Sequence, residues 1–206
     1  MTRSSLRALL LVLLALPTTS VVRASLADEA ERPVAAEAVE PVTVLLVRHA
    51  EKAADDPRDP GLTESGEERA RAFARLAGSA GVTHLFATPY RRTRATLAPL
   101  ARLTGLEVAD VSAADAAEVA ARLRELAPGS IAVVAGHSNT TPQLVRALGA
   151  EPSGLVDGPY GEMIPEHAYD RLFVVTFAAP GTQGEPRAPG LLELRYGAES
   201  APPDGR

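Results

Sequence analysis

The sequence contains no cysteine and no tryptophan, and aromatic residues make up only 4% of its 206 residues. Without cysteine the chain has no disulfide bond, no reactive thiolate, no zinc–thiolate site and no lipid attachment through a cysteine. Because aromatic residues are scarce, the core must consist mainly of alanine, leucine and valine. Hydrophobic residues still account for 46% of the chain, which suffices for one sizeable domain and excludes a wholly disordered protein.

The chain also lacks an excess of positive charge. It has 26 acidic and 21 basic residues, a formal net charge of -5. A net-acidic protein is a poor candidate for nucleic-acid binding, so we expect no nucleic-acid partner. None of the four histidines has a histidine four residues away or a nearby cysteine, so the sequence predicts neither a metal site nor a cofactor.

Residues 1–24 have the pattern of a signal peptide. Arg3 and Arg7 provide the positive region, Ala8 to Leu16 is unbroken and apolar, and small or aliphatic residues precede a cleavage position after Ala24. A membrane anchor is the alternative, but nine apolar residues fall short of the ~20 needed to span a bilayer. We therefore expect an exported protein, periplasmic or secreted, that has no membrane attachment after cleavage.

Three further segments follow the signal peptide. Residues 25–40 are acidic and rich in alanine, and they are typical of a flexible linker. Residues 41–196 carry the periodic patterns of a folded domain, and residues 197–206 are expected to be a disordered tail.

The domain alternates between two kinds of pattern. Short apolar runs, several rich in β-branched residues, predict strands at 42–47, 83–87, 131–135, 172–177 and 191–196. Helical periodicity predicts helices at 67–77, 93–103, 114–126 and about 141–148, with Ser65 and Glu68 as a capping box and Thr141-Pro142 opening the last helix. This order predicts an α/β three-layer sandwich with a mostly parallel sheet flanked by helices, and the last two strands antiparallel at an edge.

Residues able to bind or attack phosphate follow three of the predicted strands. Arg48-His49 ends the first, Arg91-Arg92 lies just after the second, and residues 136–139 (GHSN) follow the third. Ligands of open α/β sheets bind outside the carboxyl ends of the strands. Grouped there, these side chains would form a local positive pocket in an otherwise acidic protein.

Four segments, in order, resemble the motifs of one family. Residues 46–52 (LVRHAEK) resemble the RHG/RHA signature of the histidine phosphatase superfamily, in its small single-domain, phosphoglycerate mutase-like branch. Residues 62–66 (LTESG) are similar to its LT-x-x-G turn, 88–96 (TPYRRTRAT) to its SP-x-x-R-A-x-x-T segment, and 134–140 (VAGHSNT) to its GH segment. An isolated RH pair would mean little, but four motifs in the expected order are specific.

The resemblance implies a role for each matched residue. His49 would attack phosphorus and form a phosphohistidine, while Arg48, Arg92 and His137 would bind the phosphoryl oxygens. Arg92 matches the family position better than its neighbour Arg91. The helix after His137, beginning near Ser138 and Asn139, would add backbone donors to the phosphate.

The family usually needs an acid that protonates the leaving group. Asp115 is the favoured candidate for this acid, with Glu118 and Glu51 as alternatives; some small members have no dedicated acid.

We therefore predict an exported, cofactor-independent phosphatase that hydrolyses small phosphate monoesters. One alternative is a serine esterase of the α/β-hydrolase type, in which Ser138 would be the nucleophile with Asp157 and His167 as partners. Against it, Thr140 stands where the nucleophile elbow has glycine, and little chain remains for the later strands. The other alternative is a non-catalytic module that only captures phosphate.

Overall fold

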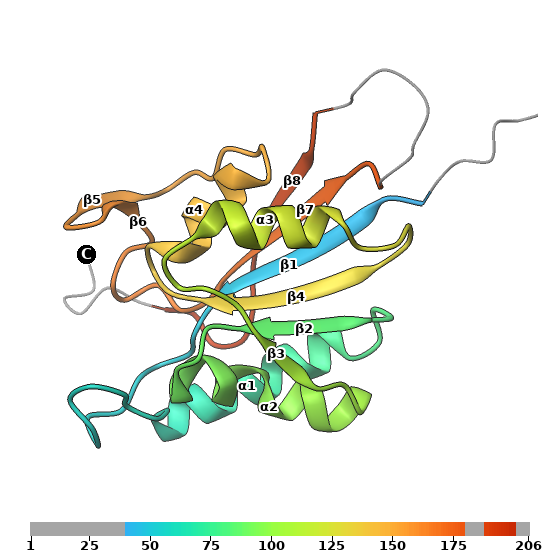
Figure 1. Ribbon diagram of the computed structural model, residues 1–206. Coiled ribbons are helices and arrows are strands. Elements are labelled where there is room, and N and C mark those ends of the chain that lie inside the picture. The colour runs from blue at the N-terminus through green and yellow to red at the C-terminus, as the bar shows by residue number, and fades with distance from the viewer. Residues whose placement is uncertain (1–39, 180–187, 201–206) are drawn as a thin grey trace, which may run out of the picture. The chain divides into compact units, whose positions relative to one another are not determined.

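The computed structural model describes residues 40–179 and 188–200, which contain one six-stranded mixed sheet with helices on both faces (Figure 1). The strand order is β3-β2-β4-β1-β7-β8. These strands are β1 (Val42–Arg48), β2 (His84–Ala87), β3 (Val108–Asp110), β4 (Ile131–Gly136), β7 (Arg171–Phe177) and β8 (Gly190–Arg195). The helices are α1 (Glu64–Ala77), α2 (Arg91–Thr104), α3 (Ala116–Arg124) and α4 (Thr140–Ala147), and a separate hairpin comprises β5 (Val156–Gly158) and β6 (Gly161–Met163).

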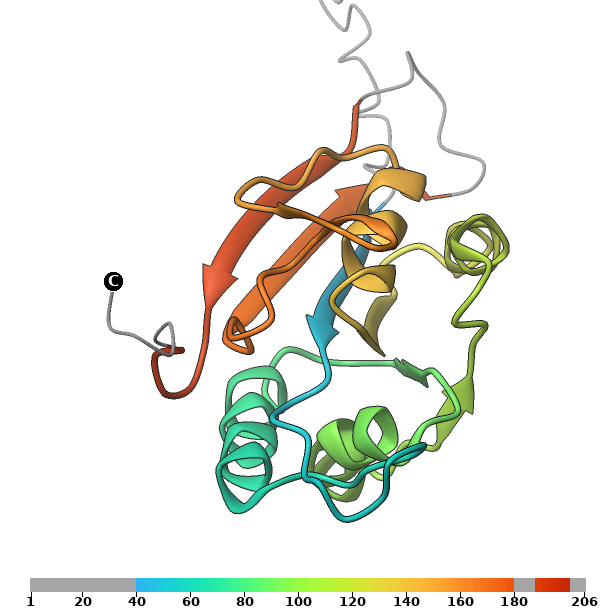
Figure 2. The ribbon, with the colours of Figure 1, turned by 90° about the vertical axis from the view of Figure 1, so that its left-hand side faces the viewer.

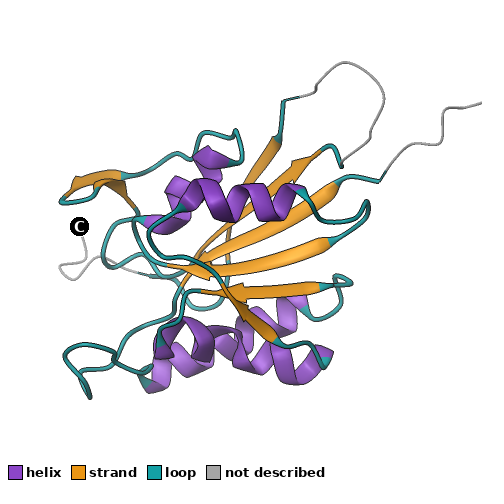
Figure 3. Ribbon diagram, viewed as in Figure 1, coloured by secondary structure: helices purple, strands orange, loops and turns teal. Residues whose placement is uncertain are grey.

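The sheet is the middle of three layers, as predicted: α1 and α2 cover one face, and α3 and α4 cover the other (Figure 3). Strand β1 shows why. Its side chains alternate, so that Leu46 packs in the cluster with α3 and α4 while Leu45 and Val47 pack in the cluster with α1 and α2. Both faces of the strand are buried, which explains its continuous apolar run.

Three of the five strand pairs in the six-stranded sheet are parallel. Strands β3, β2, β4 and β1 pair in parallel, whereas β7 runs antiparallel to both β1 and β8. The prediction of an antiparallel pair at one edge is confirmed, and β8 is the edge strand. The carboxyl ends of β2, β4 and β1 therefore lie side by side.

The four helices begin one to three residues from their predicted starts, and two predicted N-caps are wrong. Helix α1 begins at Glu64, and its N-cap is Thr63, whose hydroxyl accepts a hydrogen bond from the Gly66 amide at 3.0 Å. Helix α4 begins at Thr140 after the N-cap Asn139, so Pro142 lies later in the first turn, where its missing N–H costs nothing. Strands β3, β5 and β6 were not predicted, because each has only three residues and no apolar run.

The predicted signal peptide, residues 25–39 of the predicted linker and residues 201–206 lie outside the described residues. Residues 197–200, expected to belong to the tail, contact the domain: Arg69 on α1 donates to the carbonyl of Ala198 at 2.9 Å. Among the described residues, no helix has the length and apolar character needed to cross a bilayer.

Candidate active site

The predicted phosphate-binding residues meet where β1, β2 and β4 end, the side of the sheet that Figure 2 views. Arg48 on β1 lies opposite Gly136 on the parallel strand β4. The backbone amide of His49 donates a hydrogen bond to the Gly136 carbonyl at 2.8 Å. The rings of His49 and His137 consequently lie 5.4 Å apart, centroid to centroid. They line a pocket of about 460 Å³ together with Arg48, Arg92, Ser138 and Asn139.

His49 is held in the form that a nucleophile requires. Its side chain is buried, and Nδ1 lies 2.8 Å from the carbonyl oxygen of Ala50. A carbonyl only accepts hydrogen bonds, so Nδ1 carries the proton and Nε2 keeps its lone pair. Burial, reinforced by the positive charge of Arg48, lowers the pKa of His49 to about 3, although the bond to Ala50 acts in the opposite direction. The imidazole is therefore neutral at physiological pH.

His137 is fixed by a chain of hydroxyl groups that the sequence did not reveal. Its Nε2 lies 2.9 Å from the Thr88 hydroxyl, which donates its own proton to the Thr93 hydroxyl at 3.1 Å; Thr93 in turn donates to the Thr88 carbonyl at 2.7 Å. Because the Thr88 proton is already used, Nε2 of His137 must be the donor in its bond to Thr88. Nδ1 then accepts from Arg92 at 3.4 Å.

The charge state of His137 agrees with this arrangement. Burial, together with the nearby guanidinium groups of Arg92 and Arg48, lowers the pKa of His137 to about 4. The ring is therefore neutral at physiological pH, with its single proton on Nε2.

Arg48 is a buried cation anchored by the loop that precedes β7. One terminal nitrogen donates to the carbonyls of Pro165 and Glu166, at 3.1 and 2.7 Å, and the other pairs with the Glu166 carboxylate at 3.1 Å. The guanidinium also lies 4.2 Å from the centroid of the Tyr169 ring, a cation–π contact. These contacts fix the guanidinium beside His49.

Arg92 is held more loosely, at the first turn of α2. Its guanidinium lies 4.5 Å from the centroid of the Tyr90 ring and 3.7 Å from the carboxylate of Asp59. Arg92 lines the pocket, whereas its neighbour Arg91 does not and instead pairs with Asp55 at 3.2 Å.

Both pocket arginines keep one donor unpaired. Nε of Arg48 and Nε of Arg92 are buried and have no hydrogen-bond partner among the described residues. A buried donor without a partner costs about 1–3 kcal/mol and is uncommon in folded proteins, where it calls for an explanation such as a catalytic role. Two guanidinium donors beside a neutral imidazole are suited to the oxygens of a phosphoryl group.

A sequence profile of the histidine phosphatase superfamily (branch 1) matches residues 44–135, the part of the chain that contains Arg48, His49 and Arg92. Over these 92 of its 206 residues, the chain is similar to the histidine phosphatase superfamily. The match supports a phosphatase, and the matched motifs lie at the strand ends where the pocket forms. No curated protein sequence matches the chain.

Two solved structures with TM-scores above 0.5, the first two described below, share the fold of this chain. The protein histidine phosphatase SixA, solved with tungstate, is 19% identical and superposes with a TM-score of 0.55, covering 74% of this chain and 96% of its own. Mycobacterial hydrolase 2 is 17% identical with a TM-score of 0.54, over 77% of this chain and 93% of its own. Mycobacterial glucosyl-3-phosphoglycerate phosphatase is 17% identical with a TM-score of 0.46, over 67% and 91%.

The structure does not place the favoured acid of this histidine phosphatase in the pocket. The exposed Asp115 is the N-cap of α3, and its carboxylate accepts from the Glu118 amide at 2.9 Å. Glu118 is exposed on α3, and Glu51 forms a 2.8 Å ion pair with Arg69. None of the three lines the pocket, so the structure does not bring the predicted acids together with Arg48, His49, Arg92 and His137.

One carboxyl group that the sequence reasoning missed does line the pocket. Glu166 pairs with Arg48 at 3.1 Å and with Lys52 at 3.5 Å, and 65% of its side chain is exposed. It lies in an irregular loop before β7, where no periodic pattern or motif marks it. Tyr169, which packs on Arg48, comes from the same loop.

The residues of the serine esterase alternative are not brought together. Ser138 lines the pocket, but Asp157 is exposed in the β5–β6 hairpin and His167 lines a different pocket. No hydrogen bond joins any two of these three described side chains, so the structure shows no triad.

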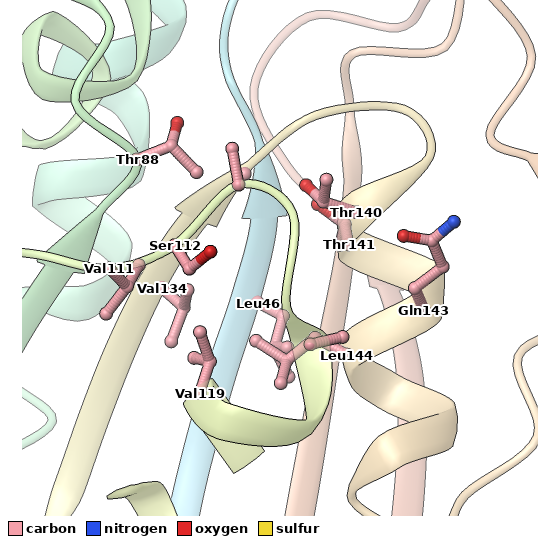
Figure 4. Close-up of a pocket in the computed structure, with 13 residues that line it drawn as sticks. Leu46, Thr88, Val111, Ser112, Val119, Val134, Thr140, Thr141, Gln143 and Leu144 are labelled. Atoms are coloured by element: carbon pink, nitrogen blue, oxygen red, sulfur yellow. The ribbon is translucent and has the colours of Figure 1, made fainter. Parts of the chain in front are cut away.

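A small apolar cavity lies behind the pocket, between the sheet and helices α3 and α4 (Figure 4). Its volume is about 20 Å³, room for about one water molecule, and it is therefore too small for a substrate. Leu46, Val134 and Leu144 contribute to its wall, and Thr88 borders it. No group of three described His, Asp or Glu side chains is arranged to hold a metal ion.

Proposed function

We propose that the protein hydrolyses small phosphate monoesters through a phosphohistidine on His49. The observation that carries this proposal is the state of His49: a buried, neutral imidazole whose Nδ1 proton is held by Ala50 and whose Nε2 lone pair is free. Beside it lie two arginines that each keep an unpaired buried donor. A neutral imidazole is a competent nucleophile, and fixed cations stabilise the charge that spreads over the phosphoryl oxygens.

The reaction then has two steps. In the first, Nε2 of His49 forms a bond to phosphorus as the bond to the leaving oxygen breaks; in the second, water breaks the P–N bond and releases inorganic phosphate. Arg48 and Arg92 bind the phosphoryl oxygens throughout, and no metal is required. We propose that a solvent water donates the proton to the leaving oxygen, because Glu166 forms ion pairs with two cations.

We further propose that this reaction takes place outside the cytoplasm. The support is the pattern of residues 1–24: two arginines, an apolar stretch from Ala8 to Leu16 and a cleavage position after Ala24. Export would separate the enzyme from cytoplasmic phosphohistidine proteins, which favours a small-molecule ester as its substrate. Amino-terminal sequencing of the secreted or periplasmic protein should begin at Ser25; an uncut chain retained in the cytoplasm would contradict export.

The test of the activity is replacement of the nucleophile. His49→Ala should lower the hydrolysis of p-nitrophenyl phosphate by roughly 10⁴-fold or more, as loss of a covalent nucleophile does elsewhere, with an unchanged circular dichroism spectrum. Ser138→Ala is the matched control in the same pocket, and it should keep much of the activity. Wild-type turnover in His49→Ala would exclude His49 as nucleophile. If the wild-type protein binds phosphate but hydrolyses no phosphate ester, it is a non-catalytic binding module.

A further inference from the structure

Two cationic side chains line the active-site pocket and have no part in the proposed reaction. They are Lys52, four residues after the end of β1, and Arg58, in the loop that follows. The Arg58 guanidinium has no ion-pair or hydrogen-bond partner among the described residues, and Lys52 contacts only Glu166, at 3.5 Å. Of the four described cations that line the pocket, Arg58 alone has no such partner, because Arg48 and Lys52 pair with Glu166 and Arg92 with Asp59.

The acids of the loop that carries Arg58 bond to groups other than Arg58's guanidinium; among them, Asp59 lies 3.7 Å from Arg92. The carboxylate of Asp56 accepts from the amides of Arg58 and Asp59, at 2.7 and 3.1 Å. Asp55 accepts from an amide of the same loop and pairs with Arg91 on α2 at 3.2 Å. These bonds fasten the loop to α2 and leave the Arg58 guanidinium at the pocket.

We infer that Lys52 and Arg58 form a second anion subsite, and that the preferred substrates carry a carboxylate or a second phosphate on the leaving group. This inference rests on the proposed function, since it concerns the same pocket. A pocket of about 460 Å³ lies within the range of about 300–1,000 Å³ that binds whole small molecules, so it holds more than a phosphoryl group. With Arg48 and Arg92 binding the phosphoryl oxygens, Lys52 and Arg58 remain for the other end of the ligand.

An apolar leaving group is the competing occupant. Tyr160 and Met163, from the β5–β6 hairpin, also line the pocket, and Tyr160 is 68% exposed. An apolar group would gain contact with these two side chains but would displace water from Lys52 and Arg58 without replacing it. Removing water from a cation without supplying a partner is unfavourable, so an anion at this end of the ligand is the better match.

Binding of non-hydrolysable phosphonates tests the subsite independently of turnover. 4-Phosphonobutanoate and 4-hydroxybutylphosphonate differ only in a carboxylate or a hydroxyl group at the far end of the chain. Calorimetry on the full chain should show about fivefold tighter binding of the carboxylate, the size expected for one exposed ion pair. The preference should shrink as salt is added, because exposed charges are screened.

Charge-changing variants locate the subsite. Arg58→Gln and Lys52→Gln should each reduce the preference for the carboxylate ligand to about twofold or less, whereas Glu166→Gln should increase it by removing the competing anion. Arg102→Gln is the matched control, because Arg102 is an exposed arginine of α2 that does not line this pocket. It should leave the preference unchanged.

The outcomes of these experiments distinguish failure of the anion-subsite proposal from failure of the phosphatase proposal. Equal binding of the two phosphonates, or tightest binding of uncharged butylphosphonate, would overturn the anion subsite while leaving the phosphatase proposal intact. A carboxylate preference that Arg58→Gln abolishes would support the subsite even if the corresponding phosphate esters were not hydrolysed. In that case only the catalytic proposal would fail.

Discussion

At the scale of single residues, the sequence predicted that four side chains would meet at one pocket, which the structure shows, but it could not predict their hydrogen-bonded states. Arg48, His49, Arg92 and His137 stand directly at strand or helix ends, within motifs that read locally along the chain. The tautomer of each histidine depends on partners that folding supplies. For His137 the decisive partner is Thr88, 49 residues away.

The prediction at the residue scale concerns the contribution of the Thr88 hydroxyl to kcat. Thr88→Val keeps the shape but removes the acceptor of the His137 Nε2–H bond, so the ring loses its fixed orientation. We expect kcat to fall about tenfold, corresponding to one hydrogen bond, while Thr88→Ser restores most of it. Steady-state kinetics on p-nitrophenyl phosphate measures both variants. Equal kcat in Thr88→Val and wild type would show that the hydroxyl chain has no catalytic consequence.

At the scale of elements, the long apolar runs predicted the main strands, and helical periodicity predicted four helices. Their ends were less accurate, because caps such as Thr63 depend on which amide the hydroxyl meets after folding. Loops were beyond prediction: Glu166 reaches the pocket through the irregular segment before β7. The burial of Arg69 could not be predicted either. In the sequence of α1 it resembles any surface arginine, but in the structure only 4% of it is exposed.

Arg69 joins three segments and should matter for stability. It forms a 2.8 Å ion pair with Glu51, after β1, and donates to the carbonyls of Tyr196 and Ala198 after β8. Arg69→Ala leaves a mostly buried carboxylate unpaired, so we expect a loss of about 3–5 kcal/mol in the free energy of unfolding.

The matched control for Arg69 lies on the same helix. Arg71 pairs with Glu67 at 3.5 Å in an exposed i,i+4 contact, and Arg71→Ala should cost less than about 0.5 kcal/mol. Urea unfolding at equal m-value compares the two variants. Similar losses in both would mean that the buried pair has no special role.

At the scale of the whole molecule, an acidic protein places four of its 21 basic residues at one pocket, and two neutral histidines lie among them. The cost of keeping these histidines neutral appears in the pH dependence of stability. The folded pKa values are about 3 for His49 and about 4 for His137, against 6.5 for an unperturbed histidine. Below pH 6.5 the unfolded chain therefore binds protons that the folded protein does not.

The free energy of unfolding should therefore fall as the pH drops from 6.5 towards 4, by up to about 1.4 kcal/mol per pH unit for each histidine. Urea unfolding at pH 7.5 and pH 5 measures this slope. The double variant His49→Gln/His137→Gln should flatten it, because neither glutamine titrates. A slope identical to that of the wild type would indicate that other groups cause the acid sensitivity.

The central claim is a covalent bond between His49 and phosphorus, and trapping that intermediate tests it most directly. Rapid quenching in base during turnover of a ³²P-labelled monoester should yield labelled protein whose label is stable in base, labile in acid and mapped to His49. Label on Ser138, or turnover that never labels the protein under conditions that capture other phosphohistidines, would contradict the claim.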